Sequence, residues 1–245
     1  MRKAGVLMDR ERDVVIAARR LRKEYTVGEN VVKALDGVDM EALRGEFVCI
    51  AGRSGSGKST LLSLLAGLES PTEGEVEILG KRMDLMNERE RIRFRKENIG
   101  FVFQSYNLMA QYTTLENVAL PLMIRGVPEA ERSELAKKAL ALVGLSEHAE
   151  HRPTELSGGQ QQRVGIARAI ITHPPIVFAD EPTGNLDTKT SDEVMELLTS
   201  IFRKWNATFI LVSHDPDMTR YTDRTIRLLD GRVVEDKFKE DTKND

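Results

Sequence analysis

The sequence predicts an α/β protein whose core is a parallel sheet. Short apolar runs, typical of strands buried on both faces, alternate with helical patterns along the chain: Phe47–Ala51, Ile99–Phe103, Ile176–Ala179 and Phe209–Val212. A glycine-rich loop follows the first run, and two adjacent carboxylates follow the third. At 245 residues the chain is long enough for one large domain with its own core.

Other patterns flank these runs. The segments around Val14–Ala18 and Val31–Met40 indicate strands of an antiparallel meander. Near the C-terminus, Thr225–Leu229 and Arg232–Glu235 flank the turn Asp230-Gly231, which predicts a hairpin.

The middle of the chain predicts helices without a strand, from about residue 105 to residue 168. Pro128 is expected to open one of these helices and Gly144 to close it. We interpret this stretch as a helical insertion. Residues 237–245 are charged and poor in apolar side chains, which predicts a flexible tail.

Composition limits the classes of function. The formal net charge of −3 gives no indication of nucleic-acid binding. The single cysteine, Cys49, lies in an apolar run, so we expect a small core residue and a cytoplasmic location. No apolar run approaches the ~18–20 residues that span a bilayer, and Met1-Arg2-Lys3 is followed by charged residues, unlike a secretion signal. Any membrane association is therefore expected to come through a partner.

The glycine-rich loop fits the phosphate-binding pattern G-x-x-x-x-G-K-[ST] between a predicted strand and a predicted helix. Its candidate binding residues are Gly52, Ser54, Gly55, Ser56, Gly57, Lys58, Ser59 and Thr60. Glycines allow backbone N–H groups to face a phosphate, and the helix N-terminus adds partial positive charge. We expect Lys58 to reach the β- and γ-phosphates and the Ser59 hydroxyl to bind Mg²⁺. The alternative is a glycine-rich turn with an exposed lysine.

The strand at Ile176–Ala179 ends in Asp180 and Glu181. Ligands of open parallel sheets bind at the carboxyl ends of strands, and adjacent side chains point in different directions. We assign Asp180 to Mg²⁺ and Glu181 to general-base activation of the attacking water. An acidic helix N-cap is the alternative.

A second candidate anion-binding helix start lies at Leu156-Ser157-Gly158-Gly159-Gln160. Ser157 suits an N-cap, and the two glycines leave backbone N–H groups uncovered. A capped helix with a glycine-rich lead, without any ligand, would have the same pattern.

In chain order, the loop at Gly52–Thr60, the Leu-Ser-Gly-Gly-Gln segment at 156–160 and the strand that ends in Asp180-Glu181 resemble the ATP-binding-cassette ATPases. The resemblance covers nearly the whole chain, and Leu-Ser-Gly-Gly-Gln is specific to that family. The resemblance implies one cassette domain at residues 12–236, with a RecA-like P-loop NTPase core, an N-terminal antiparallel β subdomain and the inserted α-helical subdomain. It implies ATP and Mg²⁺ as ligands. It also implies a head-to-tail homodimer, in which the Ser157–Gln160 segment of one subunit covers the ATP bound by the Lys58 loop of the other.

Four further residues match family positions. The resemblance implies that Gln104 senses Mg²⁺ and the attacking water, and that His214 contacts the γ-phosphate and orients Glu181. It places Asp187 at the dimer interface, although Gly184-Asn185 before it departs from the commoner Ser-Ala. Tyr25 takes the position of the aromatic residue that stacks on adenine, with a packed tyrosine as the alternative.

Several segments, including Gly100–Gln104 and Leu115–Leu122, resemble the subgroup of lipoprotein-release, macrolide- or peptide-export and cell-division ATPases (LolD-, MacB- and FtsE-type). The expected function is ATP hydrolysis that drives an integral-membrane permease from the inner face of the cell membrane. A soluble cassette acting on DNA or ribosomes, and a regulatory ATP-dependent clamp with negligible turnover, are the alternatives. Either a partner-docking surface or packing inside the helical insertion explains the apolar group Tyr106, Leu108, Met109, Tyr112 and Leu115.

Overall fold

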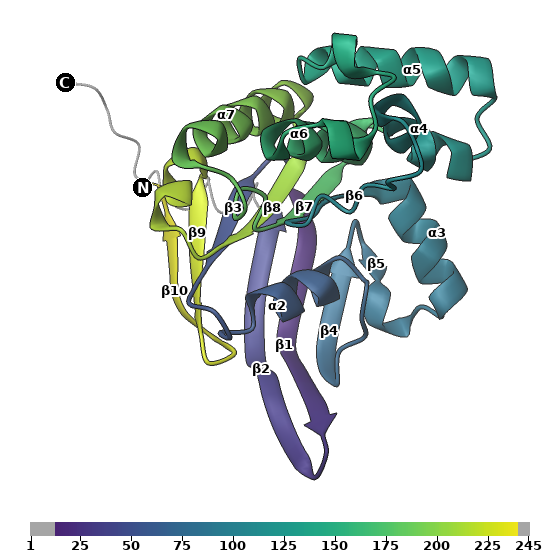
Figure 1. Cartoon of the computed structure of the whole chain (residues 1–245). Helices are drawn as coiled ribbons and strands as arrows, with labels where there is room; N and C mark the ends of the chain where they lie inside the picture. Colours follow the sequence, from purple (N-terminus) through teal and green to yellow (C-terminus); the bar gives the residue numbers. More distant parts are fainter. Residues whose placement is uncertain (1–12, 240–245) are drawn as a thin grey trace, which may run out of the picture. The chain divides into compact units, whose positions relative to one another are not determined.

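The computed structural model describes residues 13–239, which form two compact units (Figure 1). Unit 1 combines residues 13–92 with residues 206–239, and unit 2 comprises residues 93–205. The boundary falls inside helix α3 (Glu88–Asn98). Among residues 13–239, no helix combines the length and apolarity that crossing a bilayer requires.

Unit 1 contains an antiparallel sheet in the order β2-β1-β4-β5. Its strands are β1 (Val14–Val27), β2 (Asn30–Leu43), β4 (Glu73–Ile78) and the short β5 (Lys81–Arg82). Ile16 and Ile78 are neighbours across the β1–β4 pair and are fully buried, so this sheet has an apolar face. The predicted antiparallel strands are confirmed, but β4 pairs with β1 and not with β2, so the strand order differs from that of a meander. β1 extends well beyond its predicted segment Val14–Ala18.

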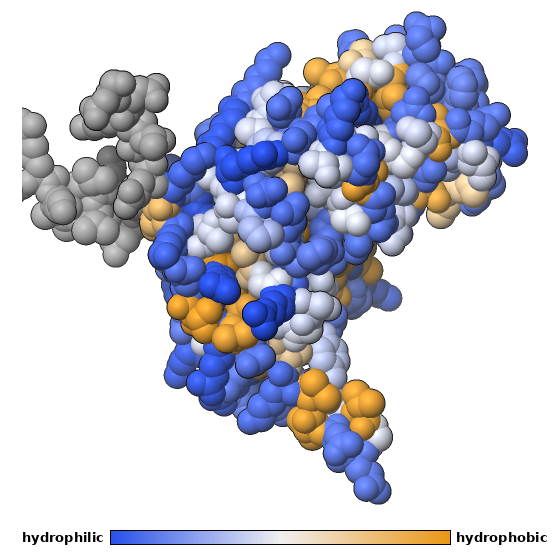
Figure 2. Space-filling view, turned by 60° about the vertical axis from the view of Figure 1, so that its left-hand side comes forward, coloured by the Kyte–Doolittle hydropathy of each residue, from blue (hydrophilic) through white to orange (hydrophobic). Residues whose placement is uncertain are grey.

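The free end of the β1–β2 hairpin carries exposed apolar side chains. Figure 2 shows apolar side chains gathered toward the bottom of the view, at the free end of this hairpin. Val27, Val31 and Val32 there are 50–63% exposed. In both β1 and β2, one end of the strand packs on the core and the other end does not. The alternation of apolar and polar residues is present only at the packed end, so it could not predict the full length of either strand.

Unit 1 also contributes four strands to a mixed sheet, in the order β10-β9-β3-β8. β3 (Phe47–Ala51) lies between β8 (Thr208–Ser213) and β9 (Arg224–Leu229), parallel to both, and β10 (Arg232–Phe238) closes the predicted antiparallel hairpin. Every residue of β8 is buried, as a strand covered on both faces requires. Cys49 on β3 is buried as predicted, and burial raises the pKa of its thiol to about 12, so the thiol stays protonated.

The helical pieces of unit 1 are short. α2 (Lys58–Leu65) follows β3 and buries four leucines, Leu61, Leu62, Leu64 and Leu65. Two 3₁₀ turns, η2 (Met83–Leu85) and η5 (Pro216–Tyr221), complete the unit.

The sequence predicts a flexible tail from residue 237, but strand β10 extends to residue 238. Residues 237 and 238 belong to β10 and pair with Thr225 and Arg224 of β9. The Arg224 guanidinium lies 4.7 Å from the centre of the Phe238 ring and also binds Asp236, which fixes this end of the strand. Residues 240–245 of the predicted tail lie outside the described residues.

Unit 2 pairs two parallel strands with helices. β6 (Ile99–Val102) and β7 (Ile176–Asp180) match the predicted runs closely. The helices are α4 (Thr114–Ile124), α5 (Glu129–Leu142), α6 (Gly158–Ile170) and α7 (Thr188–Trp205), with the 3₁₀ turns η3 (Ser146–His148) and η4 (Pro153–Glu155) before α6. Pro128 precedes α5, and Gly144 follows it at φ 71°, as predicted.

Candidate nucleotide-binding site

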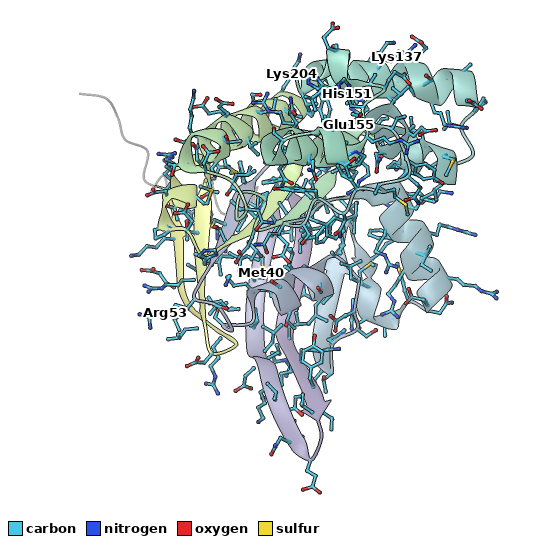
Figure 3. The ribbon with its side chains drawn as sticks, viewed as in Figure 1. Met40, Arg53, Lys137, His151, Glu155 and Lys204 are labelled. Carbon is cyan, nitrogen blue, oxygen red and sulfur yellow. The ribbon has the colours of Figure 1, made fainter. Side chains whose placement is uncertain are left out.

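The glycine-rich loop connects β3 to α2 in unit 1, as the phosphate-binding pattern requires. The loop turns back on itself, because the Ser56 N–H and the Lys58 Nζ both donate to the Arg53 carbonyl, at 3.2 and 2.9 Å. The Lys58 side chain is thus held over the loop rather than extended into solvent. The exposed Arg53 side chain points away from the ribbon (Figure 3).

Two glycines of this loop leave no space for a side chain. A Cβ at Gly52 would lie 2.5 Å from the Leu228 carbonyl oxygen, and one at Gly57 would lie 2.4 Å from the Ala34 carbonyl oxygen. Gly57 also has φ 97°, a conformation that L-residues rarely adopt, and is the N-cap of α2. Neighbouring strands therefore fix the path of the loop.

We predict that Gly57→Ala lowers the free energy of unfolding by about 3 kcal/mol, since strain at positive φ adds to displacement of the Ala34 backbone. Gly55→Ala is the matched control. Gly55 also has a positive φ, 78°, but a Cβ there meets nothing within 4 Å, so its cost should be about 1 kcal/mol. Urea unfolding measures both, and equal losses would contradict the steric argument.

His214 lies beside the loop because of strand register. Ala51 of β3 and Ser213 of β8 are paired, so Gly52 and His214 each follow the paired positions of neighbouring parallel strands. The His214 side chain is exposed. Unit 1 therefore brings the loop and this histidine to one edge of the sheet.

Tyr25 is attached to the same region through its hydroxyl group. The hydroxyl donates to Glu69 Oε2 at 2.8 Å and also bonds the side chain of Thr60, in the first turn of α2. Burial, and then the Glu69 bond, raise the pKa of Tyr25. The Lys23 Nζ lies 5.0 Å from its ring centre. The ring is half-buried, and its stacking on adenine stays a prediction.

In unit 2, Gln104 and the two carboxylates lie at the carboxyl ends of two paired strands, and Asp180 is the last residue of β7. Val102 of β6 is paired with Ala179 of β7, so Gln104 and Glu181 are each two residues beyond this pair. Glu181 has φ 43°, in the left-handed region that costs a non-glycine residue of order 1 kcal/mol or more. Such strain is typical of functional positions, and the sequence alone gave no sign of it.

The segment after Glu181 packs on Gln104. The Asn185 side-chain amide donates to the Gln104 carbonyl oxygen at 3.1 Å. A Cβ at Gly184 would lie 2.8 Å from Gln104 Nε2. The departure Gly184-Asn185 thus has a local reason: the glycine makes room for Gln104, and the asparagine binds its backbone.

The Leu-Ser-Gly-Gly-Gln segment begins α6 with a complete capping box. The Ser157 Oγ accepts from the Gln160 N–H at 3.3 Å, and the Gln160 Oε1 accepts from the Ser157 N–H at 2.8 Å. A Cβ at Gly159 would lie 2.5 Å from Thr190 Cγ2, and one at Gly158 would lie 3.0 Å from the Tyr106 hydroxyl. The two glycines therefore permit close packing, in addition to leaving N–H groups uncovered.

Arg168 is a structural residue that our sequence reasoning missed. Its guanidinium donates to the carbonyl oxygens of Tyr106 and Asn107 at 2.7 and 2.6 Å. Both residues have positive φ, 59° and 49°, and burial lowers the pKa of the arginine. This contact fastens the chain just after Gln104 to α6. Arg168 follows Ser157 by eleven positions on a helix and has no local motif that could have revealed it.

Asp187 caps α7. Its carboxylate accepts from the Thr190 N–H at 3.0 Å and from the Thr190 hydroxyl at 2.6 Å, and the bonds from Thr190 lower its pKa. The structure thus gives Asp187 a role in helix capping, and its role at a dimer interface stays a prediction.

The candidate ligands of Mg²⁺ are all oxygen donors: the Ser59 hydroxyl, the Gln104 amide oxygen and the Asp180 carboxylate. Mg²⁺ prefers such donors and is commonly bound by one or two carboxylates together with substrate phosphates. The residues present therefore fit the ion chemically.

Comparison with known proteins identifies the family. The model of the ABC transporter family matches residues 35–184. The chain is 46% identical over 221 residues to the macrolide export ATP-binding/permease protein MacB of Chlorobaculum tepidum, covering 90% of this chain but 34% of that protein. It is 45% identical over 216 residues to the lipoprotein-releasing system ATP-binding protein LolD of Geobacter metallireducens, covering 88% and 96% of the two chains.

Solved structures agree. A dimeric post-hydrolysis state of the ATP-binding cassette MJ0796, bound to ADP and Pi, matches with a TM-score of 0.85 and 41% identity, over 91% of this chain and 98% of that one. The chain therefore belongs to the ABC transporter family, as an ATP-binding and ATP-hydrolysing cassette of the α/β class with an antiparallel β subdomain and helical parts. The expected family, subgroup, fold class and ATPase activity are confirmed.

Proposed function

We propose that this chain is the ATP-hydrolysing subunit of a membrane complex and works as a head-to-tail homodimer on the inner face of the cell membrane. The observation that carries the proposal is the fully capped helix start at Ser157–Gln160, present in unit 2 in addition to the phosphate loop of unit 1. Relatives that are ATP-binding proteins of export and lipoprotein-release systems support it.

Each residue has a distinct proposed role. The loop N–H groups and Lys58 bind the β- and γ-phosphates, and Tyr25 stacks on adenine. Glu181 accepts the proton of the attacking water, while Gln104 and His214 orient the water and the γ-phosphate. Mg²⁺, held by Ser59, Asp180 and Gln104, would neutralise charge on the phosphates.

The Ser157–Gln160 segment completes the site of the other subunit. The N–H groups of Gly158 and Gly159 lie in the first turn of a thirteen-residue helix, where partial positive charge favours a phosphate. A MJ0796 structure described as dimeric supports this arrangement.

The membrane partner is proposed to dock on unit 2. A pocket of about 160 Å³ lies between α4 and α5. Its apolar and aromatic lining consists of Tyr112, Leu115, Ala119, Leu120 and Met123. Two of these, Tyr112 and Leu115, belong to the apolar group singled out in the sequence, whereas Tyr106 packs near Gly158 instead.

The occupant we propose is a short cytoplasmic helix of the permease. The pocket can hold one large apolar side chain, because about 150 Å³ accommodates an aromatic ring. Glu116, Glu129 and Arg132 also line the pocket, and the Arg132 Nη2 lies 3.7 Å from the Glu129 Oε2. One net negative charge therefore remains beside the anchor, which favours a basic residue on the partner. The transported or extracted molecule would be selected by the permease, as in lipoprotein release, macrolide or peptide export, or transmission of force across the membrane.

The experiment is affinity purification from detergent-solubilised membranes of the source cells, followed by identification of the bound proteins. We expect an integral-membrane protein that binds the parent chain and is lost with Leu120→Arg, which fills the pocket with a charge. Leu142→Arg, at an exposed site on α5 outside the pocket, is the matched control. Recovery of ribosomal or DNA-bound partners instead would contradict the proposal.

A further inference from the structure

We propose that His148 is a positioning residue for the Ser157–Gln160 segment and acts through the Gln160 side chain. This inference rests on the proposed function, because it assigns a support to the segment that would complete the second ATP site. It concerns residues 143–160, which lie within unit 2.

His148 ends the 3₁₀ turn η3 on the connection from α5 to α6, where Figure 3 also shows His151 and Glu155. Its Nε2 lies 3.0 Å from Gln160 Nε2. Its Nδ1 is buried and has no hydrogen-bond partner among the described residues. The bond to Gln160 is therefore the one polar contact that orients the ring.

The direction of this bond follows from the capping box. Gln160 Oε1 already accepts from the Ser157 N–H at 2.8 Å, so the amide nitrogen must be the atom facing His148. An amide nitrogen can only donate, so His148 Nε2 is the acceptor in this arrangement, which corresponds to the tautomer with its hydrogen on Nδ1. In this tautomer the histidine bond holds the Gln160 amide in the orientation that the capping box requires.

That orientation is the one on which the helix cap depends. With the amide turned over, Gln160 would direct its NH₂ group at the Ser157 N–H, and two donors would face each other. The Ser157 N–H would then lose its acceptor, and the turn that holds Gly158 and Gly159 would lose half of its capping box. His148 is half-buried, and its ring centre lies 5.1 Å from that of His151.

The test compares three variants at position 148 and one at position 151. His148→Leu, which removes the acceptor, should lower kcat for ATP about three- to tenfold, the range of one hydrogen bond. Nucleotide affinity of the dilute protein should not change, because binding to the Lys58 loop does not involve this segment. His148→Gln, which can accept at the same reach, should restore kcat to within about twofold. His148→Lys, a donor only, should be at least as impaired as the leucine variant.

The control and the double variant separate positioning from general damage. His151→Leu should keep the parental kcat, since no bond from its side chain to α6 exists in the described chain. In a Gln160→Ala background, His148→Leu should cause no further loss, because the partner through which it acts is gone. The inference would be overturned if His148→Leu and His148→Gln had equal kcat. It would also be overturned if His148→Leu lowered kcat as much in the Gln160→Ala background as in the parent chain.

Ser157→Arg is measured together with the position 148 variants. Its turnover shows whether only the role of His148 is wrong or the proposed function as a whole. If Ser157→Arg is inactive while the position 148 variants behave alike, only the role of His148 is wrong. If Ser157→Arg keeps parental turnover, the segment is not part of an ATP site and the proposed function itself fails.

Discussion

Replacing Glu181 by glutamine should reduce ATP turnover by about 100- to 10,000-fold, the range of general-base catalysis, while nucleotide binding is retained. The amide keeps the shape of the side chain but has no basic oxygen to accept the proton of water. The substitution also removes a negative charge close to the proposed position of the γ-phosphate. A dimer with ATP bound should therefore accumulate.

Two readouts test this expectation: steady-state phosphate release, and size-exclusion chromatography with ATP and Mg²⁺. Glu196→Gln, the same change at an exposed position of α7, is the matched control and should behave as the parent chain. Hydrolysis at the parental rate by folded Glu181→Gln would exclude Glu181 as the base. The strained backbone at φ 43° would then need another explanation.

Ser157→Arg should abolish turnover at every protein concentration while the isolated chain still binds ATP. Arginine cannot replace the Oγ that accepts from the Gln160 N–H, and its bulk occupies the surface where the other subunit's phosphate is expected. Loss of an N-cap costs about 1 kcal/mol, which a folded domain of this size can tolerate. Ser157→Asp is the matched control for the cap: the carboxylate can accept from the same N–H, but its charge should repel the phosphate and also impair turnover.

The sequence was sufficient for the parts of the molecule that local chemistry determines. The buried strands at Phe47–Ala51 and Phe209–Val212, and the capped helix start at Ser157, were predicted because each depends on neighbouring residues. The phosphate loop was predicted because its glycines and lysine have a fixed spacing.

Contacts between distant residues could not be predicted in this way. Arg168 binds carbonyl groups some sixty positions earlier, and His148 binds a side chain twelve positions later. The strand residues 237 and 238 appeared to be a tail, because the ring contact and ion pair made by Arg224 become visible only in three dimensions. The left-handed backbone at Glu181 is likewise imposed by packing and not by the preference of glutamate itself.

The central claim is that each ATP site is shared between two copies of the chain, and a dilution series of ATP turnover tests it most directly. Phosphate release per chain is measured from concentrations at which light scattering shows a monomer to those at which ATP-dependent dimers form. The account predicts that specific activity rises with concentration and follows the dimer fraction. It also predicts that Ser157→Arg stays inactive throughout the series. Constant specific activity in a demonstrated monomer, together with normal turnover of Ser157→Arg, would contradict it.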